Sequence, residues 1–354
     1  MFLFPRKYRQ LLGLDITTSS IKLIELAMAG GQYRVEAYAA EPTPPNAMNE
    51  KTIVDPEAVG EGIRRAIKRS GAKSREVAIA IAGDAAITKV IQMPKGLRDS
   101  DLEAQVEMQA DQYIPFPMEE VSYDFEVLGA SEKDGDSIDV LLVASRTDNV
   151  DQRRAAVAAA GLTARIVDVE AFALENACRL MTHQMPDGGI DRTIAVVDFG
   201  ASSTTFSVLH NLKVTYTRDF SFGGQQLTEE IMRTYGLSME DAGRAKKEGG
   251  LPSNYQPEVL DAFIDDMSQQ VSRSLQFFLA SGSGREQPDQ ILVCGGCATI
   301  PGVADVIGSR VGIQTQIGDP LGQMKISSRA KSQGVDRDAT ALLTACGLAL
   351  RSFD

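Results

Sequence analysis

The sequence of 354 residues has no tryptophan, two histidines (His183 and His210) and only four cysteines. So few histidines exclude a histidine-rich metal site, and a Ser-His-Asp triad would have to use one of these two. Four cysteines in a chain of this length do not build a disulfide framework, which favours a reducing compartment. The Gly-Lys-Ser/Thr ending of a P-loop is also absent, which argues against a P-loop enzyme.

Long hydrophobic runs are missing as well. The longest uncharged apolar stretch, residues 339–350, has twelve residues, whereas a membrane span needs about 20. Residues 1–9 place their apolar side chains before the basic ones, the reverse of the order in a signal peptide. We therefore expect a cytoplasmic protein with no membrane span of its own, held at a membrane only through a partner.

Basic residues are outnumbered, with 36 lysines and arginines against 48 acidic residues and a formal charge of −12. This balance argues against a general nucleic-acid-binding protein, because phosphate contacts need a basic surface. The length fits two or three domains or one large bilobal fold.

An internal repeat organises the chain. Aligning Asp15 with Asp198 superposes residues 11–26 on residues 194–209. Both segments read as an apolar strand that ends in Asp, a turn of small residues, and a second strand. The repeat predicts two related α/β lobes, and the segment 185–189, which contains proline and two glycines, marks the boundary between them.

The turns of the repeat carry the clearest chemistry. Small residues such as Thr17, Thr18 and Ser19 leave backbone N–H groups free to form an anion nest for phosphate. Asp15 and Asp198 could bind Mg²⁺ directly or through water, because this ion prefers oxygen ligands. One Asp followed by Ser or Thr is also common turn chemistry. Two copies facing each other across a cleft favour the phosphate interpretation.

Two pairs of glycines stand at points where a ligand could approach the backbone. Gly295 and Gly296 follow an apolar strand at 291–293, where they would admit a flat ligand such as a nucleoside or form an ordinary turn. Gly223 and Gly224 precede a predicted helix, where they would face a phosphate or again form a turn.

The cysteine pair Cys294 and Cys297 has the spacing of a redox or metal site. A four-cysteine zinc site needs a second pair, but Cys178 and Cys346 stand alone in the sequence. We favour a glycine turn with two small apolar side chains.

Four motifs resemble the signature segments of actin-like ATPases, the group that includes actin, the heat-shock chaperone ATPases and the division protein FtsA. They are LGLD at 12–15, VDFG at 197–200, DVEA at 168–171 and CGGCATIPG at 294–302. The segment ADQYIPFP at 110–117, followed by EEV at 119–121, narrows the resemblance to the PilM family, the actin-like proteins of type IV pilus assembly. It extends over nearly the whole chain.

The resemblance implies an α/β, bilobal actin-like fold with an FtsA-like inserted subdomain at 87–160. The first lobe would comprise residues 1–86, completed by 161–185 and a closing helix at 339–354. The second lobe would comprise residues 190–338, with a small helical subdomain at about 225–285.

The resemblance also implies that ATP or ADP binds with Mg²⁺ between the lobes. The implied nucleotide-binding residues are Asp15, Thr17, Thr18, Ser19, Lys22, Asp198, Gly200, Ala201, Ser202, Ser203, Gly223, Gly224, Lys246, Gly295 and Gly296. Glu170 falls where related ATPases carry a water-positioning residue, and it is the one candidate catalytic residue. Lys246 is similar to a lysine near the ribose, although Gly243 stands where the glutamate usual in that segment would be.

By the same resemblance, the protein is a scaffold that grips the short cytoplasmic N-terminal tail of PilN, with nucleotide state altering partner binding and ATP turnover slow at most. PilO, reached through PilN, and the assembly ATPases would be further partners, and a homo-oligomer stays open. Two alternatives remain: a sugar or acetate kinase of the same superfamily, and a filament-forming FtsA-like ATPase.

Overall fold

Two β-sheets form the centres of two lobes in the computed structural model, which describes residues 10–131, 134–282 and 287–354. The strand order in the first lobe is β10-β6-β1-β2-β3-β16, and in the second it is β13-β12-β11-β14-β15. The strands of the first sheet are β1 (Leu12–Ile16), β2 (Ser20–Ala29), β3 (Gln32–Pro42), β6 (Glu76–Ile81), β10 (Thr163–Val169) and β16 (Lys325–Ile326). Those of the second are β11 (Thr193–Phe199), β12 (Thr204–His210), β13 (Lys213–Phe220), β14 (Gln290–Gly295) and β15 (Thr315–Ile317).

The predicted repeat is confirmed in the pairing of the strands. β1 pairs antiparallel with β2 and parallel with β6, and β11 pairs antiparallel with β12 and parallel with β14. Asp15 therefore lies opposite Lys22, and Asp198 lies opposite Thr205. The two lobes bring equivalent strand ends, each with one aspartate, to the boundary between them.

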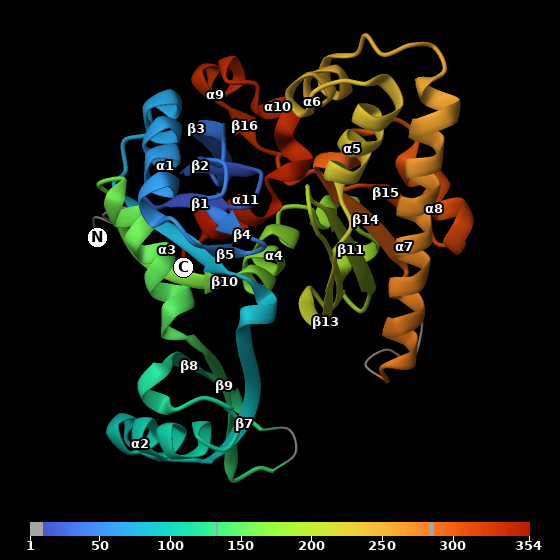
Figure 1. Ribbon diagram of the computed structural model, residues 1–354. Helices are drawn as coiled ribbons and strands as arrows, with labels where there is room; N and C mark the ends of the chain where they lie inside the picture. Colours follow the sequence, from blue (N-terminus) through green and yellow to red (C-terminus); the bar gives the residue numbers. More distant parts are fainter. Residues whose placement is uncertain (1–9, 132–133, 283–286) are drawn as a thin grey trace.

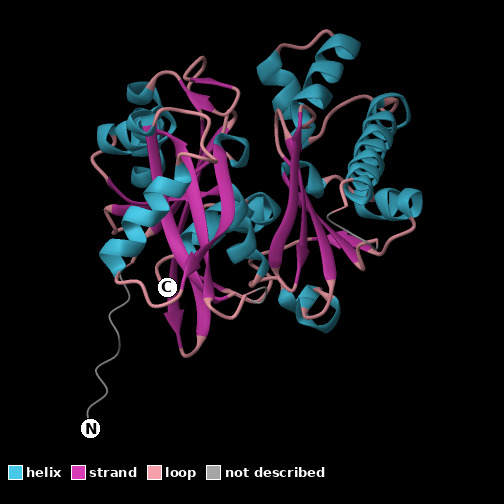
Figure 2. Ribbon diagram, turned by 90° about the horizontal axis from the view of Figure 1, so that it is seen from below, coloured by secondary structure: helices cyan, strands magenta, loops and turns pink. Residues whose placement is uncertain are grey.

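Helices cover both faces of each sheet, and Figure 2 shows the two sheets as separate layers with helices between and outside them. α1 (Pro56–Ser70) and α3 (Thr147–Ala159) share one core with the first sheet. α1 begins at an Asp55 cap with Pro56 in its first turn and ends at Gly71 in the left-handed conformation, which are common helix start and stop signals.

α4 (Glu170–Cys178) and α11 (Leu343–Leu350) lie between the two lobes. α11 packs on the first sheet, and α4 contributes to a core with β11 and β14. The two helices touch so closely that a side chain at Gly347 would lie 1.7 Å from the Ala173 carbonyl oxygen. This close backbone contact joins the helix that packs on the first sheet to the helix that packs on the second.

The other face of the second sheet carries the helices that the sequence predicts in this lobe. Alternate residues of β11, among them Val197 and Phe199, point to this face. The helices are α5 (Gly224–Tyr235), α6 (Met239–Glu248), α7 (Asp261–Ala280) and α8 (Val303–Val311). A π-helical turn at Gln256–Leu260 precedes α7.

The inserted unit projects from the first lobe (Figure 1). It consists of β7 (Ala86–Pro94), α2 (Asp99–Ala110), β8 (Val121–Ala130) and β9 (Ser137–Arg146). Its three strands, in the order β7-β9-β8, share with α2 a core drawn only from the unit. α3, which we grouped with this unit, packs on α1 instead, because its buried Ala156 and Val157 face the first sheet. We therefore place the end of the unit near residue 146.

The chain also returns to the first lobe earlier than residue 339. β16 pairs with β3, and α9 (Ser328–Ser332) and α10 (Val335–Asp338) contribute Ala330 and Val335 to the same core as α11. We therefore place the end of the second lobe before residue 325. The closing helix expected at 339–354 is divided into a 3₁₀ turn at Ala339–Ala341 and α11, which ends at Leu350.

A short hairpin, β4 (Met48–Asn49) and β5 (Thr52–Ile53), completes the first lobe, with Ala47 and Ile53 in its core. Across the described ranges, we find no helix with both the length and the apolar character to cross a membrane. Residues 1–9, on which the signal-peptide argument rests, lie outside the described residues.

Candidate functional site

Asp15 and Asp198 lie at the ends of β1 and β11, and the positive charge of Lys22 interacts with both. The Lys22 Nζ donates to Asp15 Oδ2 at 3.0 Å, and Asp15 is 8% exposed. Burial opposes the positive charge of Lys22, but Asp15 and Asp198 outweigh it, so the pKa of Lys22 is raised. Lys22 therefore stays charged and reduces the repulsion between the two carboxylates.

The surroundings of Asp198 disfavour its ionised form. Desolvation, together with the neighbouring Asp15, raises the pKa of Asp198 to about 6, although Lys22 counteracts this. A carboxylate that is costly to ionise in the free protein gains most when a cation binds next to it. The geometry thus provides a place where a divalent cation would be favoured.

The two turns of the repeat touch each other across the lobe boundary. Thr18 Oγ1 and Ser202 Oγ are hydrogen-bonded at 2.9 Å. The first turn is fixed by Thr17, which donates to the Ser20 carbonyl, and by Thr43, whose hydroxyl donates to the Thr17 carbonyl at 2.7 Å. Two turns of small residues that meet in this way could hold the oxygens of one phosphate chain between them.

Gly223 and Gly224 support the second turn. The N–H groups of Gly224 and Gln225 donate to the carbonyls of Gly200 and Ala201, at 3.0 and 2.8 Å. A side chain at Gly223 would lie 2.4 Å from the Ala201 carbonyl oxygen. In this structure, therefore, the start of α5 holds the turn in place instead of leaving its own N–H groups free for a phosphate.

Lys246 lies behind the same helix start. Its Nζ donates to the Gly224 carbonyl at 2.7 Å and to Thr228 Oγ1 at 2.6 Å. Burial lowers the pKa of Lys246, and burial raises the pKa of the nearby Cys297 to about 11. At neutral pH the thiol is protonated, which fits the packing role that we expect for the cysteines.

Gly295 ends β14 directly against the other strand end. Its φ is +89°, and a side chain there would lie 2.4 Å from Asp198 Oδ1. At Gly296 the space is open, with no atom within 4 Å of an added Cβ. Position 295 thus requires glycine because of its positive φ and the closeness of Asp198. Gly296 leaves the backbone accessible to a flat ligand.

A second ionic cluster surrounds Lys51 and includes Glu170, at the start of α4. Lys51, in the turn between β4 and β5, contacts Glu170 Oε2 at 3.3 Å and Asp219 Oδ2 at 2.5 Å. Desolvation raises the pKa of Glu170, with Lys51 opposing the shift. Thr205 donates to the other oxygen of Asp219 at 2.6 Å.

These residues fit Mg²⁺ that is bound together with a nucleotide, and not a metal ion held by the protein alone. Among the described residues no group of three or more His, Cys, Asp or Glu side chains could hold a metal alone. Mg²⁺ commonly uses one or two carboxylates and completes its shell with water and phosphate oxygens. Asp15 and Asp198 could supply the two carboxylates, and the hydroxyl turns and Gly296 could contact the rest of the ligand.

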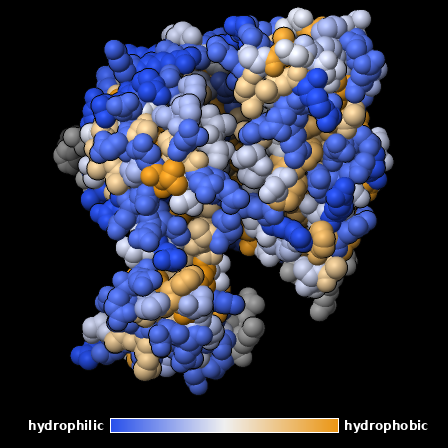
Figure 3. Space-filling view, viewed as in Figure 1, coloured by the Kyte–Doolittle hydropathy of each residue, from blue (hydrophilic) through white to orange (hydrophobic). Residues whose placement is uncertain are grey.

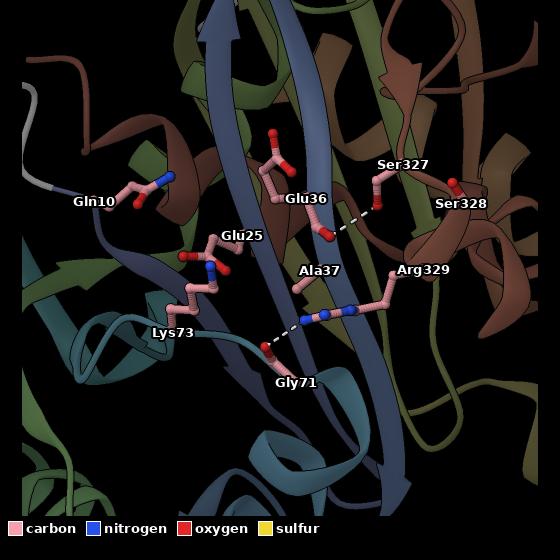
Figure 4. Close-up of a pocket in the computed structure, with 9 residues that line it drawn as sticks. All are labelled: Gln10, Glu25, Glu36, Ala37, Gly71, Lys73, Ser327, Ser328 and Arg329. Atoms are coloured by element: carbon pink, nitrogen blue, oxygen red, sulfur yellow. Dashed lines mark hydrogen bonds between the residues drawn. The ribbon is translucent and has the colours of Figure 1, made fainter.

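A polar pocket of about 440 Å³ lies elsewhere on the first lobe (Figure 4). Its wall includes the buried Glu25, whose pKa is raised mainly by desolvation, and Lys73. Arg329 donates to the Gly71 carbonyl and Ser327 to the Glu36 carbonyl. It contains none of the predicted site residues, so we do not assign the nucleotide to it.

The structure brings the strand-end aspartates and both turns together, as the repeat predicts, and it places Lys22 and Gly295 beside them. Glu170 joins them through its electrostatic interaction with Asp15. Sequence reasoning missed Thr43, Lys51 and Asp219. Nothing in their spacing marks them, because each meets the site through a contact with a distant segment.

Comparisons with known proteins agree with this fold. The family model described as type IV pilus assembly protein PilM matches residues 13–353. A chain of a solved PilM–PilN type IV pilus biogenesis complex is 27% identical, with a TM-score of 0.79 over 98% of this chain and 99% of that chain. The ethanolamine utilization protein EutJ from Carboxydothermus hydrogenoformans is 17% identical, with a TM-score of 0.57 over 98% and 92%; that likeness concerns the fold alone.

Proposed function

The chain belongs to the PilM family of type IV pilus assembly proteins and has the actin-like fold, and on that premise we propose a nucleotide-binding scaffold that grips PilN. ATP or ADP with Mg²⁺ would bind between the lobes, and the inserted unit would hold the cytoplasmic N-terminal tail of PilN. The observation that carries the first part is the meeting of two equivalent strand–turn–strand units, each with one aspartate, at the lobe boundary.

In the cleft, each residue has a distinct task. Lys22 orients Asp15 by a direct ion pair, and the two turns would bind phosphate oxygens through their N–H and hydroxyl groups. Bound Mg²⁺ would supply positive charge next to Asp198, whose pKa desolvation raises to about 6. Glu170, the one candidate base, is held in an ion pair with Lys51, so we expect slow hydrolysis at most.

The surface of the inserted unit supports the partner assignment. Five of the eleven large hydrophobic residues that are exposed in the described part of the chain belong to it: Val90, Met108, Tyr113, Val127 and Leu128. Residues 86–146 also hold 13 acidic and 5 basic side chains, a net charge of −8 out of −12 for the whole chain. Figure 3 shows the unit standing clear of the lobes over a narrow neck.

Such a surface suits a short tail that is apolar and carries a basic residue. A few buried side chains would supply most of the affinity, and the acidic surroundings would speed association at low salt. The family resemblance described above implies that PilN is the membrane partner. Binding of the PilN tail would therefore place this chain at the inner membrane. PilO and the assembly ATPases would be reached through that complex.

The test is isothermal titration of a synthetic PilN tail peptide into the full chain and into a variant in which a Gly-Ser linker joins Ala86 to Ser145. These two residues are paired across β7 and β9, and the unit has its own core, so the lobes should fold without it. We expect the variant to lose peptide binding and to keep its affinity for Mg–ATP. Equal peptide binding by both proteins would contradict the proposal.

A point variant provides a second test in the intact fold. Tyr113 is 43% exposed, so its replacement by alanine should not disturb the core, whereas the buried Ile114 next to it is 5% exposed. Weakening of peptide binding by Tyr113→Ala at unchanged thermal stability would support a docking face on the unit.

The rival function is a phosphotransferase of the same superfamily. A kinase needs a pocket for its second substrate and a base near the terminal phosphate, and the one candidate, Glu170, is occupied by Lys51. Turnover measured with sugars and acetate decides this: a scaffold shows no acceleration by any acceptor, whereas a kinase does. Sedimentation with Mg–ATP tests the filament-forming alternative.

A further inference from the structure

Lys51 connects the two lobes. It belongs to the hairpin β4–β5 of the first lobe, and its Nζ pairs with Asp219 on β13 of the second lobe at 2.5 Å. The same Nζ lies 3.3 Å from Glu170. With a side chain only 24% exposed, Lys51 offsets two carboxylates that would otherwise repel each other across the lobe boundary.

The backbone of the same residue is held from another direction. The Arg153 Nη2 on α3 donates to the Lys51 carbonyl at 3.0 Å. Arg153 is 5% exposed, an unusual place for a guanidinium group, and it interacts electrostatically with Glu170 and Asp15. A buried arginine in this position fixes the hairpin relative to α3.

α3 in turn is joined directly to the inserted unit. β9 ends at Arg146 and α3 begins at Thr147, whose hydroxyl is 3.2 Å from that of Ser122 on β8. Asn149 on α3 donates to Ser145 Oγ, which donates to the Ala85 carbonyl before β7. The first turn of α3 is thus hydrogen-bonded to the base of the unit, so a tilt of the unit would move the helix.

We propose that Arg153 and Lys51 couple the inserted unit to the opening of the cleft. Displacement of α3 would shift Arg153, this would move the hairpin, and Lys51 would tighten or release its contact with Asp219. Both are positioning residues, since neither touches the space between the two turns. That the coupled ligands are a nucleotide and the PilN tail rests on the proposed function; the mechanical link itself does not.

The mechanical link is tested without any ligand. Cysteines introduced by Lys68→Cys on α1 and Glu240→Cys on α6 are both exposed, and the four native cysteines are buried, so nitroxide labels would report the distance between the lobes. Lys51→Met should broaden that distance distribution and shift it to longer values, and Lys51→Arg should restore it.

The helix α3 offers a matched pair of variants. Arg153→Met should produce the same change as Lys51→Met, and the double variant should add little to either one, because both act on one contact. Arg154→Met is the control, since Arg154 is exposed and pairs only with Asp151 of its own helix in the described contacts. Unchanged distances in both Lys51→Met and Arg153→Met would overturn the proposal.

The second readout is the ratio of PilN-peptide affinities with and without Mg–ADP. In the Lys51→Met and Arg153→Met proteins this ratio should fall to one while each ligand still binds, and in Arg154→Met it should keep the parent value. A ratio that survives in both variants would also overturn the coupling. Failure of the parent protein to bind either ligand would instead refute the proposed function, and the label distances would still decide the link between the lobes.

Discussion

Replacing Asp198 by asparagine should make the free protein more stable and its nucleotide complex weaker. Burial raises the pKa of this carboxyl group from 3.8 to about 6. With about 1.4 kcal/mol for each pKa unit, the ionised group costs the folded state up to about 3 kcal/mol above pH 6. An asparagine of the same shape carries no charge and avoids this cost.

The sign of the pH dependence follows from proton binding. Between pH 4 and 6 the folded protein holds a proton on Asp198 that the unfolded chain has released, so this group lowers stability as pH rises. The Asp198→Asn protein should therefore equal the parent at pH 4 and gain on it up to pH 6. Above pH 6 the difference should stay constant.

Urea unfolding at pH values from 4 to 8 measures this difference, with Asp111→Asn, an exposed position in the inserted unit, as the control. Adding Mg–ATP at pH 8 should raise the melting temperature of the parent far more than that of Asp198→Asn, because only the parent gains a cation beside a buried carboxylate. A stability difference that does not change with pH, or an equal effect of Mg–ATP on both proteins, would refute the reasoning.

Other changes test the rest of the site. Gly295→Ala should destabilise the fold by about 2 kcal/mol or more, since it adds a Cβ at positive φ against Asp198, whereas Gly296→Ala should leave the melting temperature unchanged and weaken nucleotide binding in calorimetry. Lys22→Met should weaken Mg–ATP binding at least tenfold, because it removes the ion pair that orients Asp15; binding at parental affinity would show that Lys22 is dispensable. The double replacement of Cys294 and Cys297 by serine should keep nucleotide binding, and loss of a bound metal in elemental analysis would show that the pair has a metal role.

Much of the lobe architecture could be predicted because it rests on local patterns. The repeated apolar strand, aspartate and small turn predict two equivalent strand pairs, and the structure has them in matching register. α1 has local end signals of the same kind, an Asp55 cap at its start and Gly71 in the left-handed conformation at its end. β11 and β14 are buried along almost their whole length, as their nearly continuous apolar residues indicate.

What could not be predicted depends on contacts between distant segments. α3 follows the inserted unit without a break, so its sequence does not reveal that Ala156 and Val157 pack on α1. The two-residue strand β16 is recognisable only by its pairing with β3. Lys51 is one lysine in a hairpin turn, and its role appears only when residues 170 and 219 lie beside it.

A structure of the chain with bound Mg–nucleotide would test most directly whether the nucleotide binds between the lobes. We predict phosphates between the turns of residues 17–19 and 200–203, the cation at Asp15 and Asp198, and the Thr18–Ser202 hydrogen bond replaced by contacts to the ligand. The nucleoside should lie against Gly296. A nucleotide bound elsewhere, with the Thr18–Ser202 contact intact and no cation at the two aspartates, would contradict it.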